Sequence, residues 1–147
     1  NTFSNLLFHI IFSAKERIPF LVPEIRERLY PYICGIAKQN NFTIISLNGT
    51  DDHIHILSSS KPDLAVSKAT QLIKGGSSKW IRDSFPKLNI FSWQEGYGAF
   101  TVSASQTNAV KQYIANQERH HKKISFQEEY LEFLKQNDIE FDPKYLF

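Results

Sequence analysis

The sequence has almost no cysteine and no long apolar run. Of its 147 residues only Cys34 is a cysteine, so no disulfide can form within the chain, which suits a reducing compartment. No stretch approaches the ~18 apolar residues that a membrane-spanning helix needs, and no basic-then-apolar leader opens the sequence. We therefore expect a cytoplasmic protein without a membrane partner.

The sequence also lacks internal repeats and low-complexity segments. Its length is close to that of one compact domain, and 41% hydrophobic with 22% charged residues is an ordinary globular composition. Aromatic residues are numerous, with 12 Phe, 6 Tyr and 2 Trp. They predict a Phe-rich core or, alternatively, a few exposed rings that stack on bases or lie in an interface. Trp80 and Trp93 are read as core residues, with stacking on bases as the alternative.

The charge is unevenly distributed along the chain. Residues 1–123 carry 15 Lys and Arg against 9 Asp and Glu, whereas residues 124–147 carry 2 against 6. A basic body followed by an acidic tail favours a polyanionic partner for the body, although many plain domains show such a difference.

The hydrophobic pattern predicts alternating strands and helices. We expect strands at residues 5–13, 42–50, 53–60 and around 91–93 and 99–103, and helices at 23–39, 64–84, 107–121 and 126–136, with an irregular tail from residue 137. Pro23 would open the first helix, Cys34 would pack on its apolar face, and Asp63 would cap the second. The order β-α-β-β-α-β predicts an α+β, ferredoxin-like sandwich. It consists of an antiparallel sheet with helices on one face, here extended by C-terminal helices.

The triplet His53-Ile54-His55 carries the first chemical signal. Side chains alternate along a strand, so both imidazoles point the same way and could converge on one cation, or they could face solvent. Asp51 and Asp52, in the loop just before the pair, are read as turn residues. His9, in an apolar strand, is read as a core or interface histidine.

The segment "QYIANQERHHKK", residues 112–123, carries the second signal. On a helix, Tyr113 and Gln117 share one face, and a basic end containing Arg119 follows them. This pattern predicts a nucleophile, a neutral ligand and a phosphate-binding end, or alternatively a packed tyrosine before a solvated helix terminus. His120 and His121 are read as surface residues at the helix end.

Together the two segments resemble the single-tyrosine HUH transposases of the smallest bacterial insertion sequences, the transposase A type. "DHIHIL" is similar to the family's His-apolar-His strand, and "YIANQ" to its tyrosine helix. "FHIIFSAKER", "LIKGGSSKWI" and "WQEGYGAFTVS" agree in order and character, so the resemblance spans about residues 5–125. It implies a catalytic domain at 1–123, with 124–147 as an acidic helix and tail of the same domain.

The resemblance also implies an activity. These enzymes cut and rejoin single-stranded DNA that carries hairpins, so His53, His55 and Gln117 would bind Mg²⁺ or Mn²⁺. Tyr113 would attack phosphorus, leaving a 5′-phosphotyrosine and a 3′-OH, within a homodimer whose composite sites combine one chain's tyrosine with the other's histidines. The DNA-binding candidates are Lys15, Arg17, Lys74, Lys79, Arg82 and Arg119. The alternatives are a domesticated hairpin-binding protein without transposition activity and a metal-dependent phosphodiesterase that uses water.

Overall fold

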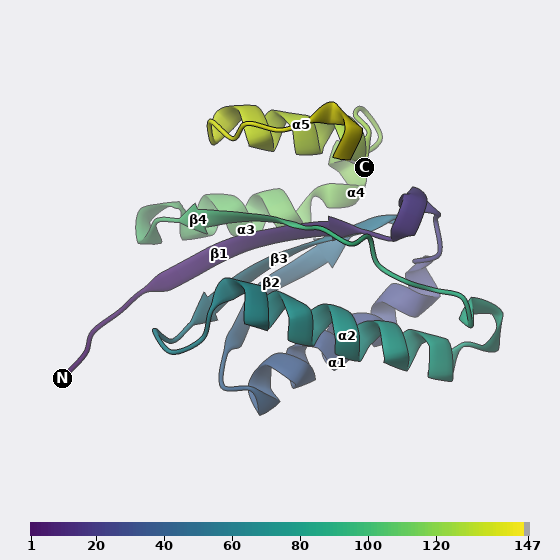
Figure 1. The fold of residues 1–147 in the computed structure, drawn as a ribbon, viewed down its shortest axis with the longest axis horizontal. Helices are drawn as coiled ribbons and strands as arrows, with labels where there is room; N and C mark the ends of the chain where they lie inside the picture. The colour runs from purple at the N-terminus through teal and green to yellow at the C-terminus, as the bar shows by residue number, and fades with distance from the viewer. Residues whose placement is uncertain (146–147) are drawn as a thin grey trace.

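The computed structural model describes residues 1–145 as a four-stranded antiparallel sheet with helices on both faces (Figure 1). The elements in chain order are β1 (Leu6–Ser13), η1 (Lys15–Arg17), α1 (Pro23–Gln39), β2 (Thr43–Gly49), β3 (His53–Ser60), α2 (Val66–Ser84), η2 (Pro86–Leu88), β4 (Gly98–Val102), η3 (Ala104–Gln106), α3 (Thr107–Ala115), α4 (Gln117–His120), α5 (Phe126–Gln136) and η4 (Pro143–Tyr145). Residues 146–147 of the predicted tail lie outside the described part. Within residues 1–145, no helix is both long and apolar enough to cross a membrane.

The sheet has the strand order β2-β3-β1-β4, which places β1 and β3 at its centre. This order and the βαββαβ succession confirm the predicted α+β, ferredoxin-like sandwich. Helices α1 and α2 cover one face of the sheet, and α3, α4 and α5 lie over the other (Figure 1). The C-terminal helices therefore cover the face that such a sandwich leaves open.

The alternation of side chains along the central strands creates two separate cores. Ile10, Phe12, Ile54 and Ile56 are fully buried in the larger core, together with the apolar sides of α1 and α2. Their sequence neighbours point to the opposite face, where Ile11 packs against α5 in one cluster and Leu57 packs against α3 in another. The C-terminal helices are thus part of the folded body, anchored by their own apolar contacts.

Four details differ from the sequence prediction. Cys34 is exposed, because the buried stripe of α1 passes through Ile33 on the neighbouring side of the helix. Asp63 does not cap α2, whose first turn follows Ala65 without a side-chain cap. The helix predicted at 107–121 is two helices, since α3 ends at Ala115 and α4 begins at Gln117. The strand predicted at 91–93 is reduced to one isolated bridge between Ala14 and Trp93.

Candidate active site

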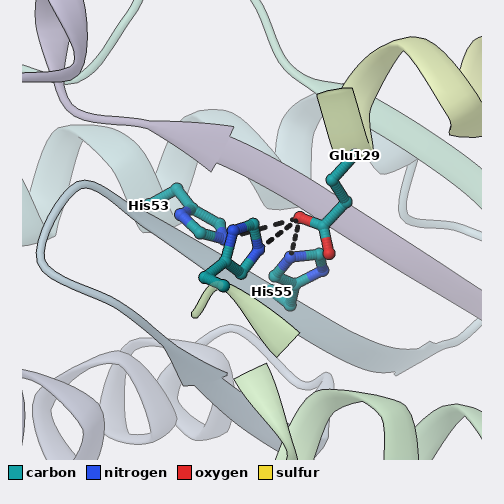
Figure 2. A group of neighbouring side chains, drawn as sticks. His53, His55 and Glu129 are labelled. Carbon is teal, nitrogen blue, oxygen red and sulfur yellow. Dashed lines mark hydrogen bonds and ion pairs between the residues drawn. The ribbon is translucent and has the colours of Figure 1, made fainter. Parts of the chain in front are cut away.

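The two histidines of the HxH triplet lie beneath the C-terminal helices. His53 and His55 occupy alternate positions of β3, so both point to the face covered by α3–α5, and both are 0% exposed. The solvent-facing reading of this pair is therefore wrong. Figure 2 shows the two imidazoles directed toward the carboxylate of Glu129, which reaches down from α5.

Loop residues immediately before β3 orient His53. Its Nδ1 lies 2.7 Å from Oδ1 of Asp52 and 3.0 Å from Oγ1 of Thr50, and Thr50 also donates to Asp52. Burial by itself would lower the pKa of His53, but its hydrogen bonds to Asp52 and Glu129 raise it to about 9. Asp52, predicted as a turn residue, thus also fixes the orientation of an imidazole, with Nε2 facing the site.

His55 is held between a second histidine and the same carboxylate. Its Nδ1 lies 2.8 Å from Nε2 of His9, and its Nε2 lies 2.9 Å from Oε1 of Glu129. Burial lowers the pKa of His55 to about 4, although Glu129 opposes this change. His9 is buried, as predicted, and burial together with the charge of His55 lowers its pKa to about 3. His9 and His55 therefore favour the neutral form.

Tyr113 and Gln117 reach this same cluster although a break in the helix separates them. Oε1 of Gln117 lies 3.2 Å from Nε2 of His53, and the Gln117 amide donates to the carbonyl of Tyr113. The Tyr113 hydroxyl donates to Oε2 of Glu129 and lies 3.2 Å from Nε2 of His120. Burial raises the pKa of Tyr113, and Glu129 raises it further because a phenolate beside a carboxylate is unfavourable.

Two residues of the cluster, Glu129 and His121, were missed by the sequence reasoning. Nε2 of His121 lies 3.0 Å from Oε1 of Glu129, so the prediction of a surface residue at position 121 is wrong. Burial would raise the pKa of Glu129, but hydrogen bonds from His121, His53 and His55 lower it well below the usual range. One signal was available: Glu129 lies on the apolar stripe of its helix beside Phe126 and Tyr130, where an acid is out of place.

The donor atoms of the cluster suit a divalent cation. One atom each from His53, His55, His121 and Glu129 lie within 4.8 Å of one another, and all four residues are largely buried. Imidazole nitrogens and carboxylate oxygens are the common protein ligands of divalent transition metals. The carbonyl oxygen of Gln117 faces the same space beside His53.

A buried arginine connects the loop before β3 to α4. Arg26 of α1 donates to the carbonyl of Leu21 at 2.6 Å, to Oδ1 of Asp51 at 2.5 Å and to Oε1 of Glu118 at 2.8 Å. Glu118 directly follows Gln117, so this contact ties the first turn of α4 to the loop that orients His53. Like Asp52, Asp51 therefore does more than form a turn.

The comparison with known families agrees with this geometry. Residues 2–117 match the family described as "Transposase IS200 like", a segment that contains the HxH triplet, Tyr113 and Gln117. The chain belongs to the IS200-like transposases. It is accordingly a member of a family of DNA-cleaving enzymes, and the resemblance inferred from the two sequence segments is confirmed.

Individual relatives are similar over most of the chain. The ISDra2 transposase TnpA of Deinococcus radiodurans is 29% identical over 119 residues, which is 76% of this chain and 84% of the relative. The transposase of insertion sequence IS200 from Salmonella typhimurium is 29% identical over 118 residues, with 77% of each chain covered.

Two solved structures are similar in fold. A transposase structure from Deinococcus radiodurans superposes with a TM-score of 0.67 at 28% identity, covering 80% of this chain and 94% of the other. A REP-associated tyrosine transposase bound to a REP hairpin superposes with a TM-score of 0.64, covering 84% and 73%. At 14% identity the second similarity shows the fold alone.

The predicted basic residues of this IS200-like transposase do not gather at the cluster. Lys79 is exposed and pairs with Asp83 on α2, which lies on the face of the sheet away from α3–α5 (Figure 1). The ammonium group of Lys74 donates to three backbone carbonyls of residues 94–96, and Arg82 donates to the carbonyl of Phe91. Lys74 and Arg82 are thus engaged in holding the loop after α2.

The remaining residues that were predicted to contact DNA lie at the surface or in the core. Lys15 and Arg119 are exposed, and Arg17 lines a cavity beside Lys15. Trp93 is buried and donates to Oγ of Ser77, so its reading as a core residue is confirmed.

Proposed function

We propose that this transposase cleaves and rejoins single-stranded DNA through a covalent bond to Tyr113. The observation that carries the proposal is the convergence of Tyr113, Gln117, His53 and His55 on one buried cluster, because these residues come from two distant segments. All four lie in the segment that matches the family. We further propose that 1–123 form the catalytic domain and that 124–147 complete it.

In the proposed step, the phenolic oxygen of Tyr113 attacks the scissile phosphorus. A bond forms between that oxygen and phosphorus, and the bond from phosphorus to the 3′-oxygen breaks, which leaves a 5′-phosphotyrosine and a free 3′-OH. Oε2 of Glu129 already accepts the hydrogen bond of the hydroxyl, so it can receive the proton as the new bond forms and pass it to the departing 3′-oxygen. Because the phosphotyrosine ester conserves the energy of the broken phosphodiester bond, a 3′-OH from another strand can later attack it and rejoin the DNA.

His53, His55 and Gln117 would hold Mg²⁺ or Mn²⁺ in this site. When bound, a divalent ion would polarise the phosphate and offset the negative charge that disfavours a phenolate at Tyr113. Asp52 and His9 hold the two imidazoles in position through their other ring nitrogens, the arrangement that commonly fixes metal-binding histidines.

DNA must reach a site that is nearly closed in this conformation. Tyr113 is half-buried and lines a cavity of about 120 Å³ with His120, Glu129 and Phe133. We propose that this cavity is where the strand enters and that α5 shifts to admit it. The exposed residues Lys15, Lys79 and Arg119 are our candidates for contacts with hairpin phosphates.

We also propose that the active species is a homodimer, since joining two element ends requires two nucleophiles and each chain supplies one Tyr113. In the single chain the tyrosine lies beside its own histidines. A composite site would require α3 to swing at Asn116, the residue between α3 and α4.

The experiment that tests the function uses a labelled single strand containing a hairpin, incubated with the protein and Mn²⁺ and separated on a denaturing gel. We expect a protein–DNA adduct that disappears in Tyr113→Phe. Cleavage that persists in Tyr113→Phe would instead indicate the phosphodiesterase that uses water. Hairpin binding without cleavage would indicate the domesticated binding protein.

Mixing two inactive variants tests the composite site. Tyr113→Phe keeps the histidines, and His55→Ala keeps the tyrosine. If the sites are composite, the mixture regains adduct formation, because the tyrosine of one chain meets the histidines of the other. A mixture that stays inactive, with each variant folded, contradicts the composite arrangement.

A further inference from the structure

Glu129 and His121 lie outside the part of the chain that matches the family. The match ends at residue 117, whereas His121 follows α4 and Glu129 lies in the first turn of α5. Both nevertheless reach the side of the cluster opposite to the strand (Figure 2 shows Glu129). The C-terminal segment thus adds donors that the matched segment does not contain.

Glu129 is a buried carboxylate with an unusual set of neighbours. Its side chain is 2% exposed, and four imidazole nitrogens surround its oxygens. Those of His53, His55, His120 and His121 lie between 2.9 and 3.5 Å from the carboxylate. Burying a carboxylate is costly unless a positive charge compensates it. A protonated imidazole can supply that charge, and so can a divalent cation bound between the imidazole nitrogens and the carboxylate.

The hydrogen bonds of His121 indicate which ring nitrogen carries its proton. Its Nδ1 lies 2.9 Å from the carbonyl oxygen of Ile124, which can only accept, so the ring proton belongs on Nδ1. In the neutral ring, Nε2 then carries a lone pair, and this lone pair faces Oε1 of Glu129 at 3.0 Å. Two acceptors at this distance need a proton or a metal ion between them.

His53 repeats the same arrangement on the other side. Its Nδ1 faces Oδ1 of Asp52, which places the ring proton there, and its Nε2 lies 3.5 Å from the same Oε1 of Glu129. Two imidazole nitrogens therefore converge on one carboxylate oxygen, and each can offer a lone pair to a metal ion that displaces its proton. Their outer nitrogens are each fixed by an acceptor, as is usual for histidines that bind a metal.

We infer that Glu129 and His121 are metal ligands, which complete with His53 and His55 a site selective for a divalent transition-metal ion. This inference deepens the proposed function and rests on its metal site. Mg²⁺ prefers a shell of oxygen ligands, whereas Mn²⁺, Co²⁺ and Zn²⁺ accept imidazole together with carboxylate. A donor set with three imidazoles therefore favours the transition metals over Mg²⁺.

Calorimetric titration of the whole chain with Mn²⁺, in the absence of DNA, tests the inference without relying on activity. Glu129→Gln removes the charge but keeps the shape, and we expect it to weaken Mn²⁺ binding at least about tenfold, since even outer partners of metal ligands contribute roughly 10- to 100-fold. Glu128→Gln is the matched control. Glu128 is exposed on the same helix, and glutamine preserves its capping box with Ser125, so binding should not change.

Two further measurements make each outcome decisive. His121→Asn should also weaken Mn²⁺ binding. This second variant tests the inference if circular dichroism shows that Glu129→Gln does not fold. A hundredfold excess of Mg²⁺ should leave Mn²⁺ bound to the unaltered protein. Glu129→Gln or His121→Asn that binds Mn²⁺ as tightly as the unaltered protein would overturn the inference, as would ready displacement by Mg²⁺.

The control for the proposed function itself is His55→Ala. If the unaltered protein binds no metal, the metal site of the proposed function fails. If His55→Ala abolishes binding while Glu129→Gln and His121→Asn do not, only the present inference fails.

Discussion

Replacing Arg26 with methionine should loosen α4 while leaving the sheet intact. The guanidinium contacts Leu21, Asp51 and Glu118 together, and the side chain of Arg26 is 7% exposed. Methionine preserves most of the apolar stem, so the substitution mainly removes the hydrogen bonds. We therefore expect a loss in the free energy of unfolding without loss of the native fold.

The magnitude follows from the exposure of each partner. Asp51 and Glu118 are 53% and 67% exposed, so water replaces the arginine at both carboxylates, and each pair contributes about 0.5 kcal/mol. The carbonyl of buried Leu21 loses a hydrogen bond to a charged donor, worth about 2 kcal/mol. The expected loss is about 3 kcal/mol, most of it from the carbonyl.

Urea denaturation followed by circular dichroism measures this loss. Arg28→Met on the same helix is the control, because Arg28 is exposed and its guanidinium lies over the rings of Trp80 and Phe85, contacts worth about 1 kcal/mol or less. Mn²⁺ affinity should also fall several-fold in Arg26→Met, since Glu118 adjoins Gln117. A loss below about 1 kcal/mol, or one equal to that of Arg28→Met, would refute the reasoning.

Three further predictions concern pH, packing and DNA. Without metal, the free energy of unfolding should be greatest near pH 6.5. Because the pKa of His55 is lowered to about 4, the fold loses stability as pH falls from 6.5 toward 4. Because the pKa of His53 is raised to about 9, the stability that His53 contributes is lost as pH rises from 6.5 to 9. Urea midpoints between pH 5 and 9 that only rise or only fall would contradict this. Gly98→Ala should displace α5 and weaken Mn²⁺ binding, because a Cβ there meets Tyr130 Cε2 at 2.8 Å; unchanged Mn²⁺ affinity would refute it. Lys79→Ala should leave the melting temperature unchanged, because its ion pair with Asp83 is exposed. It should reduce the slope of log affinity for the hairpin against log salt concentration by about the amount of one phosphate contact. An unaltered slope would exclude such a contact.

Much of the fold follows from local pattern. Periodicity predicts α1 and α5 with the bounds that the structure has, and the alternation on β3 correctly sends His53 and His55 to one face. The same kind of pattern places Tyr113 and Gln117 on one stripe, and the structure brings that stripe to the histidines. These features depend on residues close in sequence, so the sequence alone carries them.

The missed features depend on contacts between distant segments. Glu129 meets His55 across 74 positions, and nothing local indicates on which face of the sheet α5 packs. His121 looks like a solvated residue at a basic helix end until the carbonyl of Ile124 and Glu129 are placed beside it. Lys74 likewise looks like a surface cation until three backbone carbonyls surround it.

The most direct test of the account is to locate the DNA on the protein. After incubation with hairpin-containing single-stranded DNA and Mn²⁺, nuclease and protease digestion followed by mass spectrometry should find a 5′-phosphonucleotide on the peptide of Tyr113. A nucleotide attached to another tyrosine, such as Tyr97 or Tyr130, or cleaved DNA with no protein attached, would contradict the assignment of Tyr113 as the nucleophile.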